Sequence, residues 1–396
     1  MFIRKEYNVL KNRIAEPRRF IQVVVGPRQV GKSTMVKQVL ESINVPFHHA
    51  TADNVPASDS RWISEMWDVA RSNIRYGKHN EYLLVIDEIQ KVKGWSEVVK
   101  KEWDNDTFNS LNLKVVLLGS SRVLLEKGLS DSLAGRFEEI RMSHWNWPEM
   151  KEAFGVSFEE FIYYGGYPGA AAFMCDYDRW SQYIESAIVD ATINKDILQN
   201  NVILKPTLLR QAFELGSAYS GKELSLTKIV GQLQDAGNTT TISEYLRLLS
   251  DAGMLVGLQK FSIDAARKRA SAPKFQVYNN ALRTIYSDMS LDTAIRNPRE
   301  WGRFYESAIG AHIVANAFTD RYEVYYWRDG NDEVDYIIEK RGRIAAIEVK
   351  SNHENSTRGL SNFIKRFSPY RAVIVGPEGM SAEDFLSESP LKLLDL

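Results

Sequence analysis

Residues 21–39 constrain the fold of this chain more than any other stretch. They read IQVVVGPRQVGKSTMVKQV, and the apolar run at 21–25 predicts a buried strand. The run breaks at Gly26 into a loop that ends Gly31-Lys32-Ser33, after which apolar residues recur with helical spacing. This is the pattern G-x-x-x-x-G-K-S/T in the strand–loop–helix context that it requires. A glycine-rich turn with a surface lysine is the weaker interpretation.

The residue types of this loop are suited to phosphate. Glycines let backbone N–H groups point inward around a phosphate, and the following helix presents the positive end of its dipole. We expect Lys32 to reach the β- and γ-phosphates and the Ser33 hydroxyl to ligate Mg²⁺. The pattern therefore predicts a site for ATP and Mg²⁺, with the expected binding residues Gly26, Pro27, Arg28, Gln29, Val30, Gly31, Lys32, Ser33 and Thr34.

Length and composition set wider limits. A chain of 396 residues has room for about two or three domains. The net charge of −1 argues against a globally basic nucleic-acid binder but permits a local basic patch. The single cysteine, Cys175, excludes an internal disulfide. The apolar runs are far shorter than the ~20 residues of a membrane span, and the opening residues lack the apolar core of a signal peptide. We therefore expect a cytoplasmic protein with no membrane partner.

A second apolar run, residues 82–88, ends in two carboxylates. It reads YLLVIDE, which predicts a buried strand that delivers Asp87 and Glu88 at its carboxyl end. Ligands bind at this end of the strands in an open α/β sheet. We expect Asp87 to bind Mg²⁺, directly or through water, and Glu88 to orient the attacking water. An acidic pair that merely caps a strand is the alternative, and the upstream loop makes it the weaker one.

A third buried strand is predicted at 114–119, and polar residues again follow it. Ser120 or Ser121 is expected to sense the nucleotide, although serines after glycine are equally common in plain turns. Downstream, SLAGRF precedes a predicted strand at 138–142. Arg136 in this segment is a candidate for stabilising γ-phosphate charge, in its own subunit or a neighbour's. An exposed arginine without such a role is the equal alternative.

Together these segments resemble a known family. GPRQVGKS, LLVIDEIQ and LLGSSR, followed by SLAGR, are similar to the AAA+-type P-loop ATPases of bacteria and archaea. Within these, the chain resembles the ATPases that carry a C-terminal domain of unknown function and lie close to the signal-transduction (STAND) NTPases. The resemblance runs from about residue 21 to the C-terminus. It implies an AAA+-like α/β core that binds and hydrolyses ATP.

The middle of the chain predicts a helix-turn-helix with a wing. Residues 170–205 read as helical, and helices are expected within 208–234 and at 241–252. A strand at 255–261 and a return strand at 275–278 then form a hairpin whose tip holds Arg267, Lys268, Arg269 and Lys274. A basic wing of this kind predicts contact with the DNA backbone. Winged-helix folds also serve as protein-interaction modules or ATPase lids, and that alternative stays open.

The C-terminal residues carry a third constellation. Asp335 lies on one predicted strand, and Glu348 and Lys350 share a face of the next, at 344–350. This D…E-x-K pattern resembles that of restriction-endonuclease-like, PD-(D/E)XK, nucleases, and Glu306 matches the acidic residue of their first helix. Glu306, Asp335 and Glu348 are then expected to bind Mg²⁺, with Glu348 and Lys350 catalytic. A salt bridge between Glu348 and Lys350 is the alternative.

The sequence thus predicts an α/β protein in four parts. These are a P-loop ATPase core at 1–150, a helical lid or linker at 151–205, a winged helix at 206–280 and a nuclease-like domain at 281–396. The leading function is ATP hydrolysis coupled to DNA association, with metal-dependent cleavage as an open addition. The alternative is a STAND-like nucleotide-gated switch that binds a protein partner and cuts nothing. Oligomerisation is compatible with both.

Overall fold

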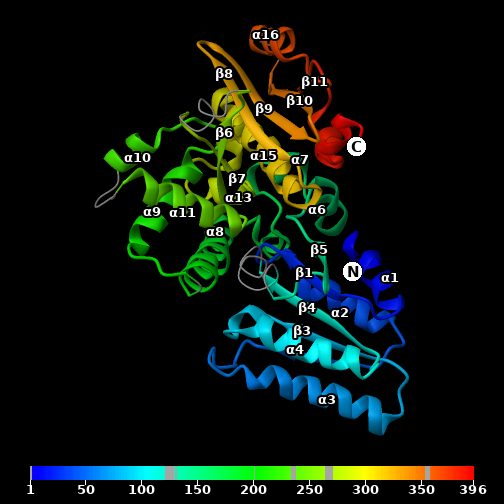
Figure 1. Ribbon diagram of the computed structural model, residues 1–396. Helices are drawn as coiled ribbons and strands as arrows, with labels where there is room; N and C mark the ends of the chain where they lie inside the picture. The colour runs from blue at the N-terminus through cyan, green and yellow to red at the C-terminus, as the bar shows by residue number, and fades with distance from the viewer. Residues whose placement is uncertain are drawn as a thin grey trace. The chain divides into compact units, whose positions relative to one another are not determined.

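The computed structural model describes residues 2–120, 129, 132–199, 201–232, 238–263, 271–352 and 357–396. The chain divides into two compact units, Met1–Met142 and Ser143–Leu396 (Figure 1). The predicted sensor Ser121 and the predicted wing-tip residues Arg267, Lys268 and Arg269 lie outside the described residues. None of the described helices is long and apolar enough to cross a membrane.

The first unit is built on a five-stranded sheet in the order β2-β3-β4-β1-β5. All neighbouring strands are parallel, so their carboxyl ends meet at one edge, the carboxyl edge. The chain leaves β1 toward β2 on one side, and leaves β4 for β5 on the other, which makes β1 and β4 the topological switch point. The strands are β1 Ile21–Gly26, β2 Phe47–Thr51, β3 Tyr82–Asp87, β4 Leu113–Ser120 and β5 Phe137–Arg141.

Helices cover both faces of this sheet (Figure 1). Right-handed crossovers place α2 on one face and α3 and α4 on the other. The helix α1 packs beside α2, and together they bury an apolar cluster that includes Leu10, Val36 and Leu118. The helices are α1 Glu6–Ala15, α2 Lys32–Ser42, α3 Arg61–Gly77, the short 3₁₀ turn η1 Ile89–Lys91, and α4 Trp95–Phe108.

The second unit begins with helices. Two of them, η4 and η5, are π-helical, a rare geometry. The helices before the sheet are α6 Trp147–Phe154, α7 Phe158–Tyr164, η3 Pro168–Phe173, α8 Tyr177–Tyr183, η4 Ile184–Asp190, η5 Thr192–Leu198, α9 Pro206–Ala218, α10 Leu226–Gln232 and α11 Thr239–Asp251. The last three precede an antiparallel pair of strands, β6 and β7, as the predicted order of helices and hairpin requires.

A six-stranded sheet in the order β11-β10-β9-β8-β6-β7 completes the second unit. Because β6 pairs with β8, the predicted winged-helix and nuclease-like segments share one sheet. The strands are β6 Leu255–Lys260, β7 Lys274–Val277, β8 Glu323–Asp329, β9 Asp332–Lys340, β10 Arg343–Val349 and β11 Arg371–Val375. The remaining helices are α13 Ala281–Thr284, α14 Leu291–Arg296, α15 Pro298–Asp320, α16 Arg358–Phe367, α17 Ala382–Ser387 and η6 Pro390–Leu394.

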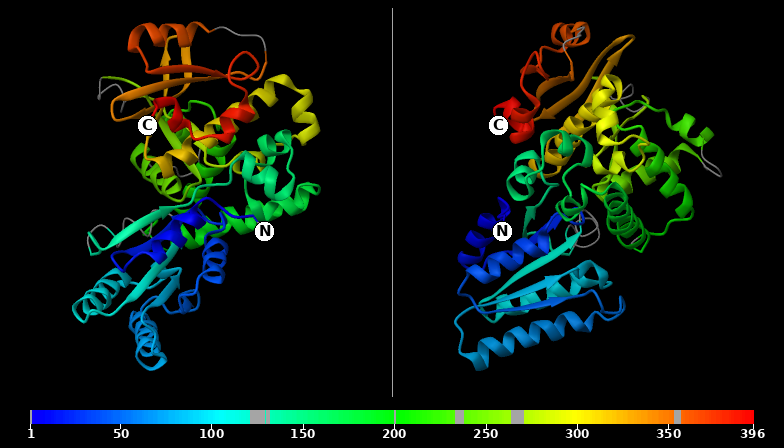
Figure 2. Two further views of the ribbon diagram at one scale, coloured as in Figure 1. Left: turned by 90° about the vertical axis from the view of Figure 1, so that its right-hand side faces the viewer. Right: turned by 180° about the vertical axis from the view of Figure 1, so that it is seen from behind.

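Two helices pack on opposite faces of this second sheet (Figure 2). On one face α15 buries Phe304 and Ile309 against Tyr336, and on the other α16 buries Phe363 against Ala346. Between β8 and β9 the pairing shifts register, which gives β9 a β-bulge at Asp335 and Tyr336. A bulge re-aims the side chains that it carries, so Asp335 is positioned by more than simple strand alternation.

Candidate functional site

The predicted phosphate loop connects β1 to α2 at the carboxyl edge. Gly31 caps α2 with φ of 90°, a left-handed conformation that glycine adopts without strain. Gly26 is required for a different reason, since a Cβ there would lie 2.3 Å from the carbonyl oxygen of Met142. The two glycines therefore fix the loop's shape, one through its backbone angle and the other through a close approach to the end of β5.

The Lys32 side chain lies inside this loop. Its ammonium donates hydrogen bonds to the carbonyl oxygens of Gly26, at 2.9 Å, and Pro27, at 2.8 Å. The residue is buried, with 8% of its surface exposed. A positive charge held among backbone groups at a helix N-terminus suits an incoming phosphate, which would exchange carbonyl partners for anionic oxygens.

Ser33 and Asp87 meet although they are far apart in sequence. The Ser33 hydroxyl donates to Asp87 Oδ2 at 2.7 Å, and the backbone N–H of Glu88 donates to Asp87 Oδ1 at 2.8 Å. They meet because the strand β3 ends at the same edge at which α2 begins. A hydroxyl and a carboxylate oxygen side by side are the hard ligands that Mg²⁺ prefers, so these residues fit the ion.

Glu88 follows Asp87 in a strained backbone conformation. Its φ of 54° and ψ of 32° lie in the left-handed region, which is uncommon for residues other than glycine. The carboxylate accepts a hydrogen bond from Gln90 Nε2 at 2.8 Å and lies 4.0 Å from the Lys91 ammonium. Strain of this kind persists only where the surroundings hold it, and it turns Glu88 away from the line of β3 at the carboxyl edge.

The predicted sensor segment ends at the same place. Ser120 is the last residue of β4 and pairs in register with Gly26, so its backbone lies at the carboxyl edge beside the loop. The position agrees with the expected contact to nucleotide. The contact itself stays a prediction.

Arg136 lies at the opposite edge of the sheet. Its carbonyl accepts a hydrogen bond from the N–H of Ile21, the first residue of β1. A strand of that length spans roughly 15–20 Å, which separates Arg136 from the phosphate loop of its own chain. Its guanidinium is held by Asp104 through two bonds of 2.7 and 3.0 Å. The predicted role in its own subunit is therefore wrong, and only the role in a neighbouring subunit remains as a proposal.

A different arginine, not expected from the sequence, lies at the carboxyl edge. Arg141, the last residue of β5, pairs in register with Val25 and so lies beside the start of the phosphate loop. Its Nε donates to Glu139 Oε2 at 2.8 Å. The signal was available, because a polar residue at the end of a predicted parallel strand belongs to the ligand-binding edge.

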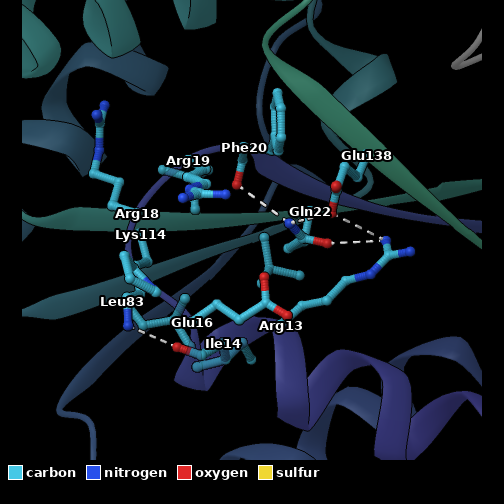
Figure 3. Close-up of a pocket in the computed structure, with 13 residues that line it drawn as sticks. Arg13, Ile14, Glu16, Arg18, Arg19, Phe20, Gln22, Leu83, Lys114 and Glu138 are labelled. Atoms are coloured by element: carbon cyan, nitrogen blue, oxygen red, sulfur yellow. Dashed lines mark hydrogen bonds and ion pairs between the residues drawn. The ribbon is translucent and has the colours of Figure 1, made fainter.

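A small cavity lies at the amino ends of the same strands (Figure 3). Gln22, Leu83 and Lys114 line it, and the Lys114 ammonium donates to the Ile14 carbonyl at 2.7 Å. Its volume of about 20 Å³ is room for a single water rather than a nucleotide. The carboxyl edge is therefore the nucleotide site that this geometry favours.

A second charged cluster lies where β7, α15 and β9 of the other unit meet. The Lys274 ammonium is 2.7 Å from Glu306 Oε1, 3.3 Å from the Asp335 carbonyl oxygen and 3.5 Å from Asp335 Oδ1. We expected Lys274 at an exposed hairpin tip, and that prediction is wrong. It is the first residue of β7, and its side chain is buried.

Glu348 on β10 pairs with Lys350, which directly follows the strand, with 2.7 Å between Oε1 and Nζ. Asp335 links the two pairs, since its Oδ2 accepts the N–H of Val349 at 2.8 Å. Burial, followed by the charge of Asp335, raises the pKa of Glu348 above its ordinary value. The buried Oε2 of Glu348 has no hydrogen-bond partner among the described residues.

The expected metal site does not form from these residues. Within the described ranges, no three His, Cys, Asp or Glu side chains are arranged to hold a metal ion. Glu306 is paired with Lys274 and Glu348 with Lys350, so each carboxylate already faces a cation. The residues present do not fit the predicted Mg²⁺, and the salt-bridge interpretation of Glu348 and Lys350 describes the geometry found.

Three family models match parts of the chain. Residues 18–151 match the model described as an AAA domain. This part of the chain is thus similar to an AAA domain. Residues 156–308 and 301–385 match two domains of unknown function, DUF8612 and DUF4143. The AAA match covers the phosphate loop and the strands that bring Asp87, Glu88 and Ser120 to it.

Similar proteins were found among both sequences and solved structures. An uncharacterised protein of Haemophilus influenzae is 24% identical over 376 residues, which is 90% of this chain and 88% of that protein. A Thermotoga maritima RuvB variant has a TM-score of 0.36 at 16% identity, covering 65% of this chain and 90% of its own. AMPPCP-bound DnaA from Aquifex aeolicus has a TM-score of 0.32 at 13% identity, covering 63% of this chain and 89% of its own.

Proposed function

We propose that the AAA domain binds ATP with Mg²⁺ at the carboxyl edge and hydrolyses it. The observation that carries the proposal is the 2.7 Å hydrogen bond between Ser33 and Asp87, which brings both expected Mg²⁺ ligands together beside the buried Lys32. The match of residues 18–151 to an AAA domain supports it independently.

Each residue then has a stated role. The backbone N–H groups of residues 28–34 would surround the β- and γ-phosphates, and the Lys32 ammonium would neutralise them. Ser33 and Asp87 would hold Mg²⁺, which supplies charge neutralisation at the phosphates when bound. The carboxylate of Glu88, next to Asp87, accepts a hydrogen bond from the attacking water and orients it toward the γ-phosphate.

We propose further that the second unit associates with DNA through its hairpin. The support is the order of α9, α10 and α11 before the β6–β7 pair, together with the basic sequence of residues 267–269. The exposed face of α11 adds little positive charge, because Arg247 on it is paired with Glu244 and Asp251. Phosphate contact would therefore depend on the hairpin tip.

The switch that binds a protein partner remains the alternative. In that case the second unit would not bind DNA, and the mixed charges of α11 would contact a protein partner. Duplex binding and its salt dependence separate the two, because phosphate contacts weaken steeply with ionic strength. Metal-dependent cleavage is not part of our proposal, since the carboxylates expected to bind the ion already face lysines.

The test of the nucleotide site is Lys32→Ala. Losing a charged hydrogen bond costs about 1.5–3 kcal/mol, so the Kd for ATP should rise roughly 10- to 150-fold by calorimetry. The matched control is Lys37→Ala on the same helix, because Lys37 is exposed and pairs only along the helix surface with Glu41 among the interactions described. Unchanged ATP hydrolysis in Lys32→Ala would contradict the assignment.

A further inference from the structure

The Lys274 ammonium occupies the centre of the second charged cluster. Three oxygens surround it, namely Glu306 Oε1 and the carbonyl and Oδ1 of Asp335, at 2.7, 3.3 and 3.5 Å. An ammonium has three N–H donors, so these three oxygens can satisfy it. The Tyr336 ring, with its centre 4.5 Å away, adds a favourable cation–π contact.

The charge of Lys274 is retained in this setting. Burial alone would lower the pKa of Lys274, but the negative charges of Glu306 and Asp335 hold it well above its ordinary value. For Glu306, burial raises the pKa, and the positive charge of Lys274 opposes this rise. The lysine is therefore the positive charge that compensates these two partly buried carboxylates.

A divalent ion held by both Glu306 Oε1 and Asp335 Oδ1 would lie against the Lys274 ammonium, which already contacts both oxygens. Mg²⁺ or Mn²⁺ binds carboxylate oxygens at about 2.0–2.2 Å, and here an ammonium already stands 2.7 Å from Glu306 Oε1. A metal ion and an ammonium that share one carboxylate oxygen would repel each other strongly, because little water lies between them. Access is not the obstacle, because Lys274, Glu306 and Asp335 line a cavity of about 300 Å³.

We propose that Lys274 is the resident cation of this cluster and excludes divalent metal from it. The lysine ties the base of the β6–β7 hairpin to α15 and to the bulge of β9 through one shared ion pair. Ligand binding by the second unit therefore does not involve a metal ion at Asp335. The residues of the D…E-x-K pattern instead form a fixed network of ion pairs. This inference is independent of the proposed ATPase.

The test is metal binding by the full chain without nucleotide. Wild type and the Lys274→Met, Lys274→Arg and Lys274→Met/Asp335→Asn variants are titrated with Mn²⁺ alone by calorimetry. Lys274→Met should gain one bound Mn²⁺ per chain relative to wild type, and adding Asp335→Asn should remove it. Lys274→Arg keeps the positive charge and should bind no more Mn²⁺ than wild type.

Two results would overturn the proposal. One is a Mn²⁺ ion bound by wild type that is lost in Asp335→Asn or Glu348→Gln, since the wild-type cluster would then hold metal beside the lysine. The other is a folded Lys274→Met that gains no Mn²⁺. If Lys274→Met does not fold, the comparison of wild type with Asp335→Asn and Glu348→Gln decides alone, because it needs no change at Lys274.

Discussion

Single residues at the carboxyl edge are held in conformations that their neighbours impose. Glu88 is the clearest case, with a left-handed backbone and a carboxylate bound by Gln90. A glutamate pays a steric cost there that glycine would not. This conformation places a second carboxylate at the end of β3, and its side chain points in a different direction from that of Asp87.

We therefore predict that Glu88→Gln binds ATP near the wild-type affinity and hydrolyses it at least about 100-fold more slowly. Glutamine keeps the size of the side chain and an oxygen that can accept from Gln90, but it is a much weaker acceptor for a proton from water. Phosphate release under saturating ATP measures turnover, and Glu41→Gln on the exposed face of α2 is the control. Turnover close to wild type would remove Glu88 from the mechanism.

At the scale of elements, the hairpin of β6 and β7 joins two regions that the sequence presents as separate. The β6 strand pairs with β7 on one side and with β8 on the other. The two strands on either side of residues 264–270 therefore belong to a larger sheet rather than to an isolated hairpin.

We predict that replacing Arg267, Lys268 and Arg269 together with alanine weakens duplex binding across unrelated sequences. The slope of log K against log salt should flatten by up to about one unit for each lost phosphate contact. The control replaces three exposed basic residues of the AAA domain, Lys37, Arg75 and Lys78, and so makes the same change in net charge. Equal affinity and slope in both triple variants would favour the protein-binding switch.

Elements were easier to predict than the contacts between them. The strands at 21–25, 82–88 and 114–119 are found because short apolar runs report burial locally. The position of Arg136 at the amino edge follows from its place just before the predicted strand at 138–142. The pairing of β6 with β8 depends on sheet order, which a local pattern does not contain. Lys274 was misplaced for the same reason, since its partners Glu306 and Asp335 lie on two other elements.

On the scale of the whole molecule, the position of Arg136 bears on whether one chain can form a complete nucleotide site alone. Arg136 is too far from the phosphate loop of its own chain to reach it, and Asp104 holds it at the amino edge. If Arg136 contributes to hydrolysis, a second copy must supply it. An oligomer is then part of the active form.

This predicts complementation between two inactive variants. Arg136→Ala should lose turnover while it still binds ATP. At an ATP concentration near the wild-type Kd, Lys32→Ala should leave its own sites largely empty while it keeps its arginine. Mixing them should restore part of the activity, since Lys32→Ala subunits would supply Arg136 to the intact sites of their neighbours. ATP turnover measured against mixing ratio is the readout. A mixture no more active than the sum of its parts, or full activity in Arg136→Ala alone, would show that the arginine has no such role.

The cluster around Lys274 also bears on how such a chain can diverge. Its three charged members come from β7, α15 and β9, and the one ammonium faces both carboxylates. A neutral residue in place of Lys274 would leave two carboxylates without their cation, which is costly. Neutral replacements at these positions should therefore be acquired together, and a descendant that lost only the lysine could survive by recruiting a metal ion in its stead.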